Sequence, residues 1–229
     1  MRQHERVAQD VQRSEFAAEL SGRVAESHFA RVYEGRPPSR EVVRTEHFIA
    51  LVDLAPLTLG HMLVVPRREV PSFAVLPEEA WREWKHLRAR LVETLSERWT
   101  HPIQFEHGST HAMRGSACVT HAHLQFLPAE LDLAEEMRRD GLVVFDVSDQ
   151  RDLVPLARGQ ERPYFFVETS DGRAHSAWAD EPIMRSQYLR RTAARALGLP
   201  DPDWDWEAVV RRDLLRATVA ELSARSLHV

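Results

Sequence analysis

The sequence contains little of what disulfide-linked or membrane-spanning proteins require. Cys118 is the only cysteine among 229 residues, so no intrachain disulfide can form and nothing demands an oxidising compartment. The longest apolar run, residues 48–59, is interrupted by Asp53 and Pro56 and is too short to cross a bilayer. Residues 1–16 have no apolar core of the kind that a signal peptide carries. We therefore expect a cytoplasmic protein with no membrane partner.

An excess of positive charge is also missing. The net charge of −5 and the pI near 6.2 argue against a general polyanion-binding surface, so nucleic acid is not an expected partner. Lys85 is the only lysine, and no Gly-x-x-x-x-Gly-Lys loop occurs, so a P-loop mechanism is not supported. The length is sufficient for one domain with a substantial core and extensions.

The hydrophobic pattern predicts a mixture of helices and strands. Apolar residues at helical spacing predict helices over residues 4–33, 77–99, 133–139, 183–197 and 206–226. Alternating or β-branched runs predict strands over residues 41–54, 61–66, 103–108, 118–128, 142–147, 164–169 and 174–178. The first two strands and the last two are each expected to form a hairpin.

Residues 120–126, Thr-His-Ala-His-Leu-Gln-Phe, are the most informative stretch of the chain. In an extended segment, successive side chains point to opposite faces, so His121, His123 and Gln125 are expected on one face and apolar residues on the other. Two imidazoles and a carboxamide in a row suit a phosphoryl group, because one ring can attack phosphorus while its neighbours hold the oxygens.

Other segments extend the pattern around this row. FIALVDLAP (48–56) is followed by GHMLVVP (60–66), and FEHG (105–108) precedes the row. Together these segments resemble the histidine triad (HIT) superfamily of nucleotide hydrolases and transferases over about residues 41–130. The resemblance implies an α+β fold: an antiparallel sheet of about five or more strands with packed helices. We divide the chain into an N-terminal helical extension (1–40), a HIT-like catalytic domain (41–150) and a C-terminal hairpin and helical extension packed on that domain (151–229).

The resemblance also implies roles for individual residues. His123 would be the nucleophile that forms a covalent nucleotidyl intermediate, His121 would help to orient the site, and His61 would lie nearby. The predicted substrate contacts are His61, Glu106, His107, Gly108 and Ser116. The expected partner is a small nucleotide conjugate, such as a dinucleoside polyphosphate or nucleoside phosphoramidate, and a homodimer is also implied.

Gln125 replaces the third histidine of the usual row. This variant resembles the galactose-1-phosphate uridylyltransferases and the diadenosine tetraphosphate phosphorylases, which are transferases. Glutamine can donate its amide N–H to a phosphoryl oxygen but supplies no proton that titrates near neutral pH. Gln125 is therefore expected to hold charge, and the choice between hydrolysis and transfer stays open.

Alternative interpretations remain at this stage. His107, His111 and His121 are candidate zinc ligands, although imidazole attack on phosphorus requires no metal or other cofactor. Residues 184–191 are predicted to form a packed helix, but Ser186, Gln187 or Arg190 could instead reach the substrate phosphates or the leaving group. The same pocket could also belong to a non-catalytic nucleotide-binding or metal-binding protein.

Overall fold

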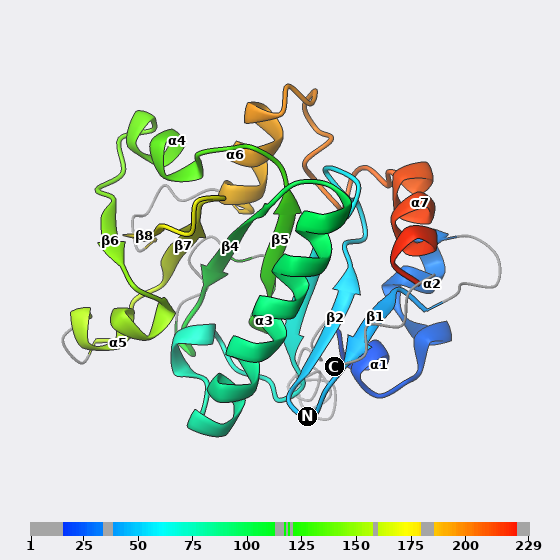
Figure 1. The fold of residues 1–229 in the computed structure, drawn as a ribbon, viewed down its shortest axis with the longest axis horizontal. Helices are drawn as coiled ribbons and strands as arrows, with labels where there is room; N and C mark the ends of the chain where they lie inside the picture. Colours follow the sequence, from blue (N-terminus) through cyan, green and yellow to red (C-terminus); the bar gives the residue numbers. More distant parts are fainter. Residues whose placement is uncertain are drawn as a thin grey trace, which may run out of the picture.

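The structure is a computed structural model that describes residues 16–33, 39–112, 117, 119, 121–157, 160–179 and 186–223. Within these residues, eight strands form one antiparallel sheet in the order β1-β2-β3-β5-β4-β7-β8-β6 (Figure 1). The strands are β1 Glu41–Arg44, β2 Phe48–Val52, β3 Met62–Pro66, β4 Pro102–Gly108, β5 Leu124–Pro128, β6 Phe145–Val147, β7 Tyr164–Glu168 and β8 Ala174–Trp178. The expected α+β class and antiparallel sheet are confirmed.

Three predicted strands are shorter than expected. The strand predicted over residues 142–147 forms only β6, Phe145–Val147. Residues 41–54 form β1 and β2 rather than one strand, because Thr45 and Phe48 exchange hydrogen bonds across a tight turn. Residues 118–128 were predicted to be extended throughout, but the regular strand begins only at Leu124. Just before it, the Ala122 N–H donates to the Val70 carbonyl at 2.8 Å, outside the ladder between β3 and β5. The histidines therefore lie at the entrance to β5.

The helices follow the predictions unevenly. The helices are α1 Ala17–Leu20, α2 His28–Tyr33, α3 Glu78–Arg98, α4 Leu133–Arg139, α5 Leu153–Leu156, α6 Tyr188–Ala196 and α7 Arg212–Ser223. The predictions for α3 and α4 are confirmed. The single helix predicted over 4–33 is wrong in its described part, because Gly22, with φ of 77°, separates α1 from a short 3-10 turn and α2. Residues 4–15 of that prediction lie outside the described residues. Residues 186–187 and 206–211, which were expected to be helical, precede α6 and α7. Residues 183–185 and 224–226 of those predictions lie outside the described residues.

The two faces of the sheet have different coverings (Figure 1). Alternate strand residues such as Phe48, Met62 and Phe126 pack with the α3 stripe in a large apolar core. The helical spacing predicts five of the α3 residues in this core, namely Trp81, Trp84, Leu87, Leu91 and Leu95, and the structure adds Ala80. The intervening strand residues face the other side, where part of the sheet is covered by α4 and α6 and another part by the segment around Phe16. The α3 face thus has one large apolar core, and the other face has two smaller apolar clusters.

Gly60 closes the turn between β2 and β3. Its φ is 80°, which L side chains rarely adopt, and an added Cβ would lie 2.5 Å from the Trp99 ring. This requirement explains why a glycine precedes His61, and the turn places His61 immediately before β3. None of the helices among the described residues combines the length and apolarity needed to span a bilayer.

Candidate active site

His123 lies immediately before β5, and a backbone hydrogen bond determines which of its ring nitrogens carries the proton. Its Nδ1 is 3.0 Å from the His121 carbonyl oxygen, which can only accept a hydrogen bond. Burial lowers the pKa of His123 from its ordinary value of 6.5, so the ring is neutral at pH 7. A neutral ring with its proton on Nδ1 carries a lone pair on Nε2. That is the form of imidazole that can attack an electrophile.

Gln125 is oriented by a chain of two hydrogen bonds beneath it. The Leu57 N–H donates to His61 Nδ1 at 3.1 Å, so the proton of the neutral ring is on Nε2. His61 Nε2 then donates to Gln125 Oε1, also at 3.1 Å. Burial lowers the pKa of His61 to about 4, which keeps this arrangement neutral at pH 7. Because the amide oxygen is held by His61, the Gln125 NH₂ group is left to donate elsewhere.

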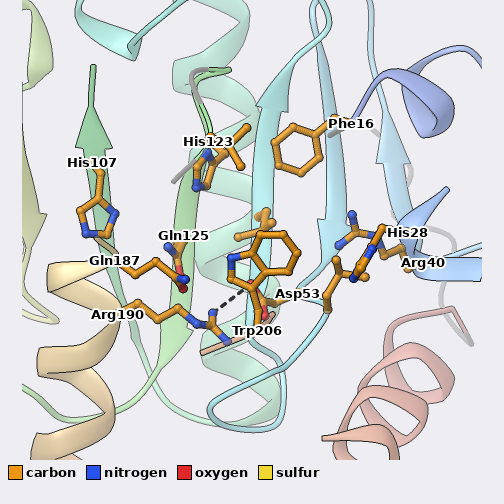
Figure 2. Close-up of a pocket in the computed structure, with 13 residues that line it drawn as sticks. Phe16, His28, Arg40, Asp53, His107, His123, Gln125, Gln187, Arg190 and Trp206 are labelled. Carbon is orange, nitrogen blue, oxygen red and sulfur yellow. Dashed lines mark hydrogen bonds and ion pairs between the residues drawn. The ribbon is translucent and has the colours of Figure 1, made fainter. Parts of the chain in front are cut away.

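A cavity opens beside these residues and is lined by three parts of the chain (Figure 2). About 610 Å³ of space that no atom occupies lies within it, part of which is open solvent. The central sheet contributes His107, His123 and Gln125. The N-terminal segment contributes Phe16, His28 and Arg40, and the C-terminal segment contributes Gln187, Arg190 and Trp206. Figure 2 shows Gln187 extending toward Gln125 and Arg190 extending toward Asp53.

His121 shares the face of His123 but has a different role. Its Nε2 lies 2.7 Å from the Pro66 carbonyl oxygen, which anchors the ring to the end of β3. Phe16 contacts both histidines, with ring centroids 5.8 Å from His121 and 5.7 Å from His123. On the opposite face, Ala122 and Leu124 enter the α3 core. The predicted alternation is therefore present, although His121 does not line the cavity.

Two buried ion pairs border the cavity, and both tie a flanking segment to the sheet. Arg40 binds Glu19 of α1 through two nitrogens, at 2.6 and 2.5 Å, and also donates to the Val52 carbonyl. Arg190 of α6 pairs with Asp53 at 3.1 Å, as the dashed line in Figure 2 marks. Arg190 also donates to the backbone carbonyls of Trp204 and Ala55.

Sequence reasoning did not assign these two pairs to the site. The sequence offered two signals. Asp53 is a carboxylate inside an otherwise apolar run, and Arg190 was a candidate for contacting the substrate phosphates. The pKa of Asp53 stays below its ordinary value of 3.8, because Arg190 and His61 outweigh the opposing effect of burial, which is the largest single influence. Asp53 is therefore ionised, and its charge is balanced by the guanidinium that lies beside it.

His107 is the only one of the predicted substrate contacts that lines the cavity within the described residues. The Leu189 N–H donates to its Nε2 at 2.9 Å, and burial lowers its pKa to about 3. His61 lies one layer deeper, beneath Gln125. Ser116 lies outside the described residues.

The structure does not bring Glu106 and Gly108 to the cavity. Strand alternation turns Glu106 to the α3 face, where it accepts hydrogen bonds from the Phe73 N–H and the Tyr164 hydroxyl, both at 2.8 Å. Burial raises the pKa of Glu106 to about 7. Gly108 allows close packing instead, because a Cβ there would lie 2.3 Å from the Tyr164 ring.

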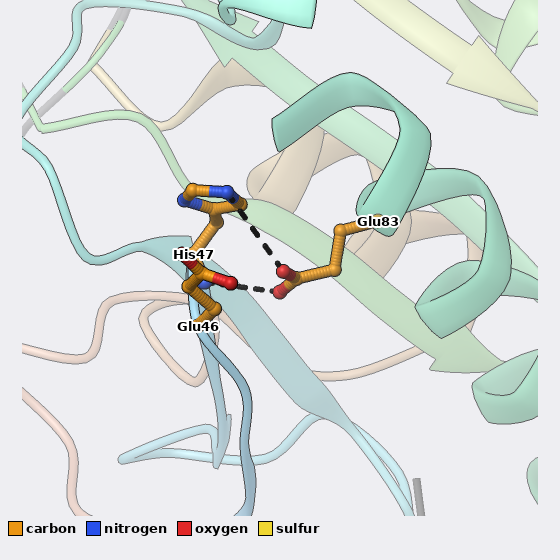
Figure 3. Close-up of side chains that lie close together, drawn as sticks. All are labelled: Glu46, His47 and Glu83. Atoms are coloured by element: carbon orange, nitrogen blue, oxygen red, sulfur yellow. Dashed lines mark hydrogen bonds and ion pairs between the residues drawn. The ribbon is translucent and has the colours of Figure 1, made fainter. Parts of the chain in front are cut away.

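The predicted zinc ligands do not gather at one point. His107 and His121 each have one ring nitrogen held by the backbone, and His111 is exposed beside a different cavity. Among the described residues, the one group of side chains close enough to share a metal ion is Glu46, His47 and Glu83 (Figure 3). There, Glu83 already accepts the His47 backbone N–H at 3.0 Å and lies 4.0 Å from its ring. In the described part of the chain, no three metal-ligating side chains gather at the His123 cavity.

Part of the chain is similar to known proteins. A family model described as HIT domain matches residues 34–130. "Protein hit" of Bacillus subtilis (strain 168) is 23% identical over 100 residues, covering 44% of this chain and 68% of that protein. A HIT-like protein involved in cell-cycle regulation from Bartonella henselae, crystallised with an unknown ligand, is 17% identical with a TM-score of 0.39, covering 51% of this chain and 75% of that one. A zinc-bound histidine triad family protein from Mycobacterium smegmatis is 21% identical with a TM-score of 0.35, covering 57% of this chain and 88% of that one. Residues 34–130 of this chain, somewhat less than half of its length, are therefore similar to the HIT domain family.

Proposed function

We propose that this protein is a nucleotide hydrolase or nucleotidyltransferase that acts on the α-phosphate of a nucleotide conjugate through a covalent intermediate on His123. The observation that carries this proposal is the neutral His123 ring, which keeps its proton on Nδ1 and faces a cavity. A ring bound to the backbone in this way needs no separate base, because its lone pair is already available. A nucleoside phosphoramidate or a dinucleoside polyphosphate is the expected substrate class.

The reaction has two balanced steps. In the first, His123 Nε2 bonds to the α-phosphorus, and the bond to the leaving group breaks. The leaving group takes the electron pair and receives a proton from solvent. In the second, water or another acceptor attacks the phosphorus, the bond to Nε2 breaks, and the acceptor loses its proton to solvent. His123 regains its lone pair at the end of the cycle.

Gln125 supports the transition state in this proposal. Charge builds on the equatorial oxygens of phosphorus while His123 attacks. The Gln125 NH₂ group is a preorganised donor for one of these oxygens, because His61 holds the amide oxygen. His107, whose Nε2 accepts from Leu189, carries its proton on Nδ1 and is a second donor in the same cavity.

Intact-protein mass spectrometry tests the covalent step. Incubation with diadenosine tetraphosphate or adenosine 5′-phosphoramidate should add the mass of one nucleotidyl group to the wild-type chain, and acid should remove it. His123→Ala should form no adduct and should lose at least about 10³-fold in turnover, since the nucleophile is absent. His86→Ala, on the exposed side of α3, is the matched control and should behave like wild type.

The outcomes separate the two functions that the sequence left open. Turnover that persists in His123→Ala would overturn the covalent mechanism. Nucleotide binding without any adduct or product, over a broad substrate panel, would favour a binding protein that uses the same cavity. The lifetime of the adduct reports whether water is an efficient acceptor, and so whether the protein is a hydrolase or a transferase. The homodimer implied by the resemblance stays a prediction.

A further inference from the structure

Gln187 lies in the cavity wall but comes from outside the matched domain. It immediately precedes α6, it is 5% exposed, and it lines the same cavity as His123 and Gln125. Its backbone φ is 58°, the only positive φ at a non-glycine residue in the described chain. This left-handed conformation is unfavourable for a glutamine, and it aims the side chain inward from the start of the helix. Figure 2 shows the amide of Gln187 extending toward Gln125.

The orientation of the Gln187 amide follows from its neighbour. The nitrogen Nε2 lies 3.4 Å from Oδ1 of Asp205, and a carboxylate oxygen can only accept a hydrogen bond. If the amide were turned over, its oxygen would face the Asp205 carboxylate oxygen, and two acceptors would repel each other. Nε2 therefore faces Asp205, and Oε1 is the amide atom that has no contact with it. This Oε1 is fully buried and has no hydrogen-bond partner among the described residues.

An unsatisfied buried acceptor and a left-handed backbone both oppose folding. Buried polar atoms in folded proteins nearly always have a partner, so an exception calls for an explanation. Core packing supplies none, because an apolar side chain of similar length would fill the same volume without the unpaired oxygen. A ligand in the cavity would satisfy the oxygen, and this explains why glutamine stands at this position.

We propose that Gln187 is a substrate-binding residue, and that its Oε1 accepts a hydrogen bond from a hydroxyl or amino group of the bound nucleotide substrate. The inference rests on the proposed function and names a contact that the HIT domain itself does not contain. The recognised group must be a donor, because an acceptor faces it. Ionised phosphate oxygens only accept, so they are not the partner of this atom. The C-terminal segment thereby contributes to substrate selection.

Three sources could supply such a donor: the exocyclic amine of the base, a ribose hydroxyl, or the O–H or N–H of the acceptor or leaving group. Binding of AMP, GMP, CMP and UMP to the wild-type protein identifies the nucleotide to use. Its 2′-deoxy, 3′-deoxy and deamino analogues then remove one donor each. The rates of adduct formation and decay report on the leaving group and the acceptor.

Gln187→Met tests the contact, because methionine matches glutamine in length and removes the oxygen. The matched control is Gln150→Met, which changes another buried glutamine that does not line the cavity. We expect Gln187→Met to keep or raise the thermal unfolding temperature, since an unpaired polar atom is lost. The same variant should bind the nucleotide about tenfold more weakly, or form or hydrolyse the adduct about tenfold more slowly. The analogue that lacks the recognised donor should bind wild type and Gln187→Met equally.

The result that overturns the inference differs from the one that overturns the proposed function. If wild type forms the adduct but Gln187→Met matches it in binding, adduct formation and adduct decay, Gln187 is not a binding residue. If Gln187→Met loses stability and affinity together for every analogue, the role is structural and the inference is also wrong. If wild type neither binds nucleotides nor forms an adduct, both proposals are wrong.

Discussion

The same strands form an apolar core on one face of the sheet and border a cavity on the other. On the α3 face, side chains such as Trp84 and Phe126 pack edge to face, with ring centroids 6.1 Å apart, in a continuous apolar core. On the other face, His123 and Gln125 interrupt the apolar packing and border a cavity. His123, Gln125 and Phe126 are close neighbours in the sequence, around the start of β5. Because successive strand side chains point to opposite faces, a side chain that packs in the core and one that borders the cavity can be adjacent in the sequence.

On the cavity face, the face of the sheet that carries His123, backbone groups fix the histidine side chains. His61, His121 and His123 each have a ring nitrogen fixed by a backbone group. Each ring is kept neutral by burial, which lowers its pKa. Water and flexible side chains would leave the tautomers mixed, whereas backbone partners select one. The cavity face therefore has several directional hydrogen bonds to histidine rings, whereas the α3 face is mainly packed apolar side chains with the hydrogen bonds of Glu106 among them.

The comparison predicts that damage to the α3 face acts on stability. Phe126→Ala should lower the free energy of unfolding by about 3–5 kcal/mol, because it removes a fully buried ring and leaves a cavity. Urea unfolding followed by tryptophan fluorescence measures this change. Val143→Ala, at a side chain that is 84% exposed, is the control and should change the free energy by less than about 0.5 kcal/mol. Equal effects from the two variants would contradict the assignment of Phe126 to the core.

The two faces should also respond to pH in opposite directions. Glu106, on the α3 face, has its pKa raised from 4.5 to about 7, so the folded chain keeps a proton that the unfolded chain loses. Its contribution to stability therefore falls as the pH rises from about 4.5 to 7. His61 and His107 have pKa values lowered from 6.5 to about 4 and 3, so their contribution falls as the pH drops below 6.5.

Glu106→Gln separates these two contributions, because glutamine imitates the protonated acid. Relative to wild type, the variant should gain stability as the pH rises from 4.5 to 7, by an amount on the order of 2–3 kcal/mol, and the gain should then level off. The loss of stability below pH 6.5 should persist in the variant, because the histidines are unchanged. Urea unfolding at pH 5, 6, 7 and 8 measures both trends. A difference between the proteins that does not change with pH would contradict the raised pKa.

The smallest effect is expected at the edge of the α3 face, where Glu46, His47 and Glu83 lie together (Figure 3). His47→Ala should reduce the free energy of unfolding by no more than about 1 kcal/mol, because the ring and its partner carboxylate are both partly exposed. Adding zinc should not change the adduct formed on His123. A metal-dependent rise in adduct formation that His47→Ala abolishes would show that this group acts on the active site.

The sequence predicted the parts of the site that depend on neighbouring residues. Alternation placed His121 and His123 on one face and Leu124 on the other, and helical spacing identified the buried stripe of α3. The same alternation, applied to residues 103–108, would have separated Glu106 from His107. Glu106 and His107 are adjacent in the segment that resembles the family, which is why both were expected to contact the substrate, and the structure places them on opposite faces.

The spacing of the chain by itself predicted a mixture of helices and strands, the placement of His123 on one face and the apolar character of the opposite face, because these depend on periodicity within short segments. The resemblance to the HIT superfamily added the antiparallel α+β arrangement. Tertiary structure alone decided which tautomer each histidine adopts and which flanking residues complete the cavity. His61 and Gln125 are 64 residues apart, and Asp53 and Arg190 are 137 apart. Local spacing carries no information about such pairs, since their contacts form only when the sheet and its two flanking segments fold together.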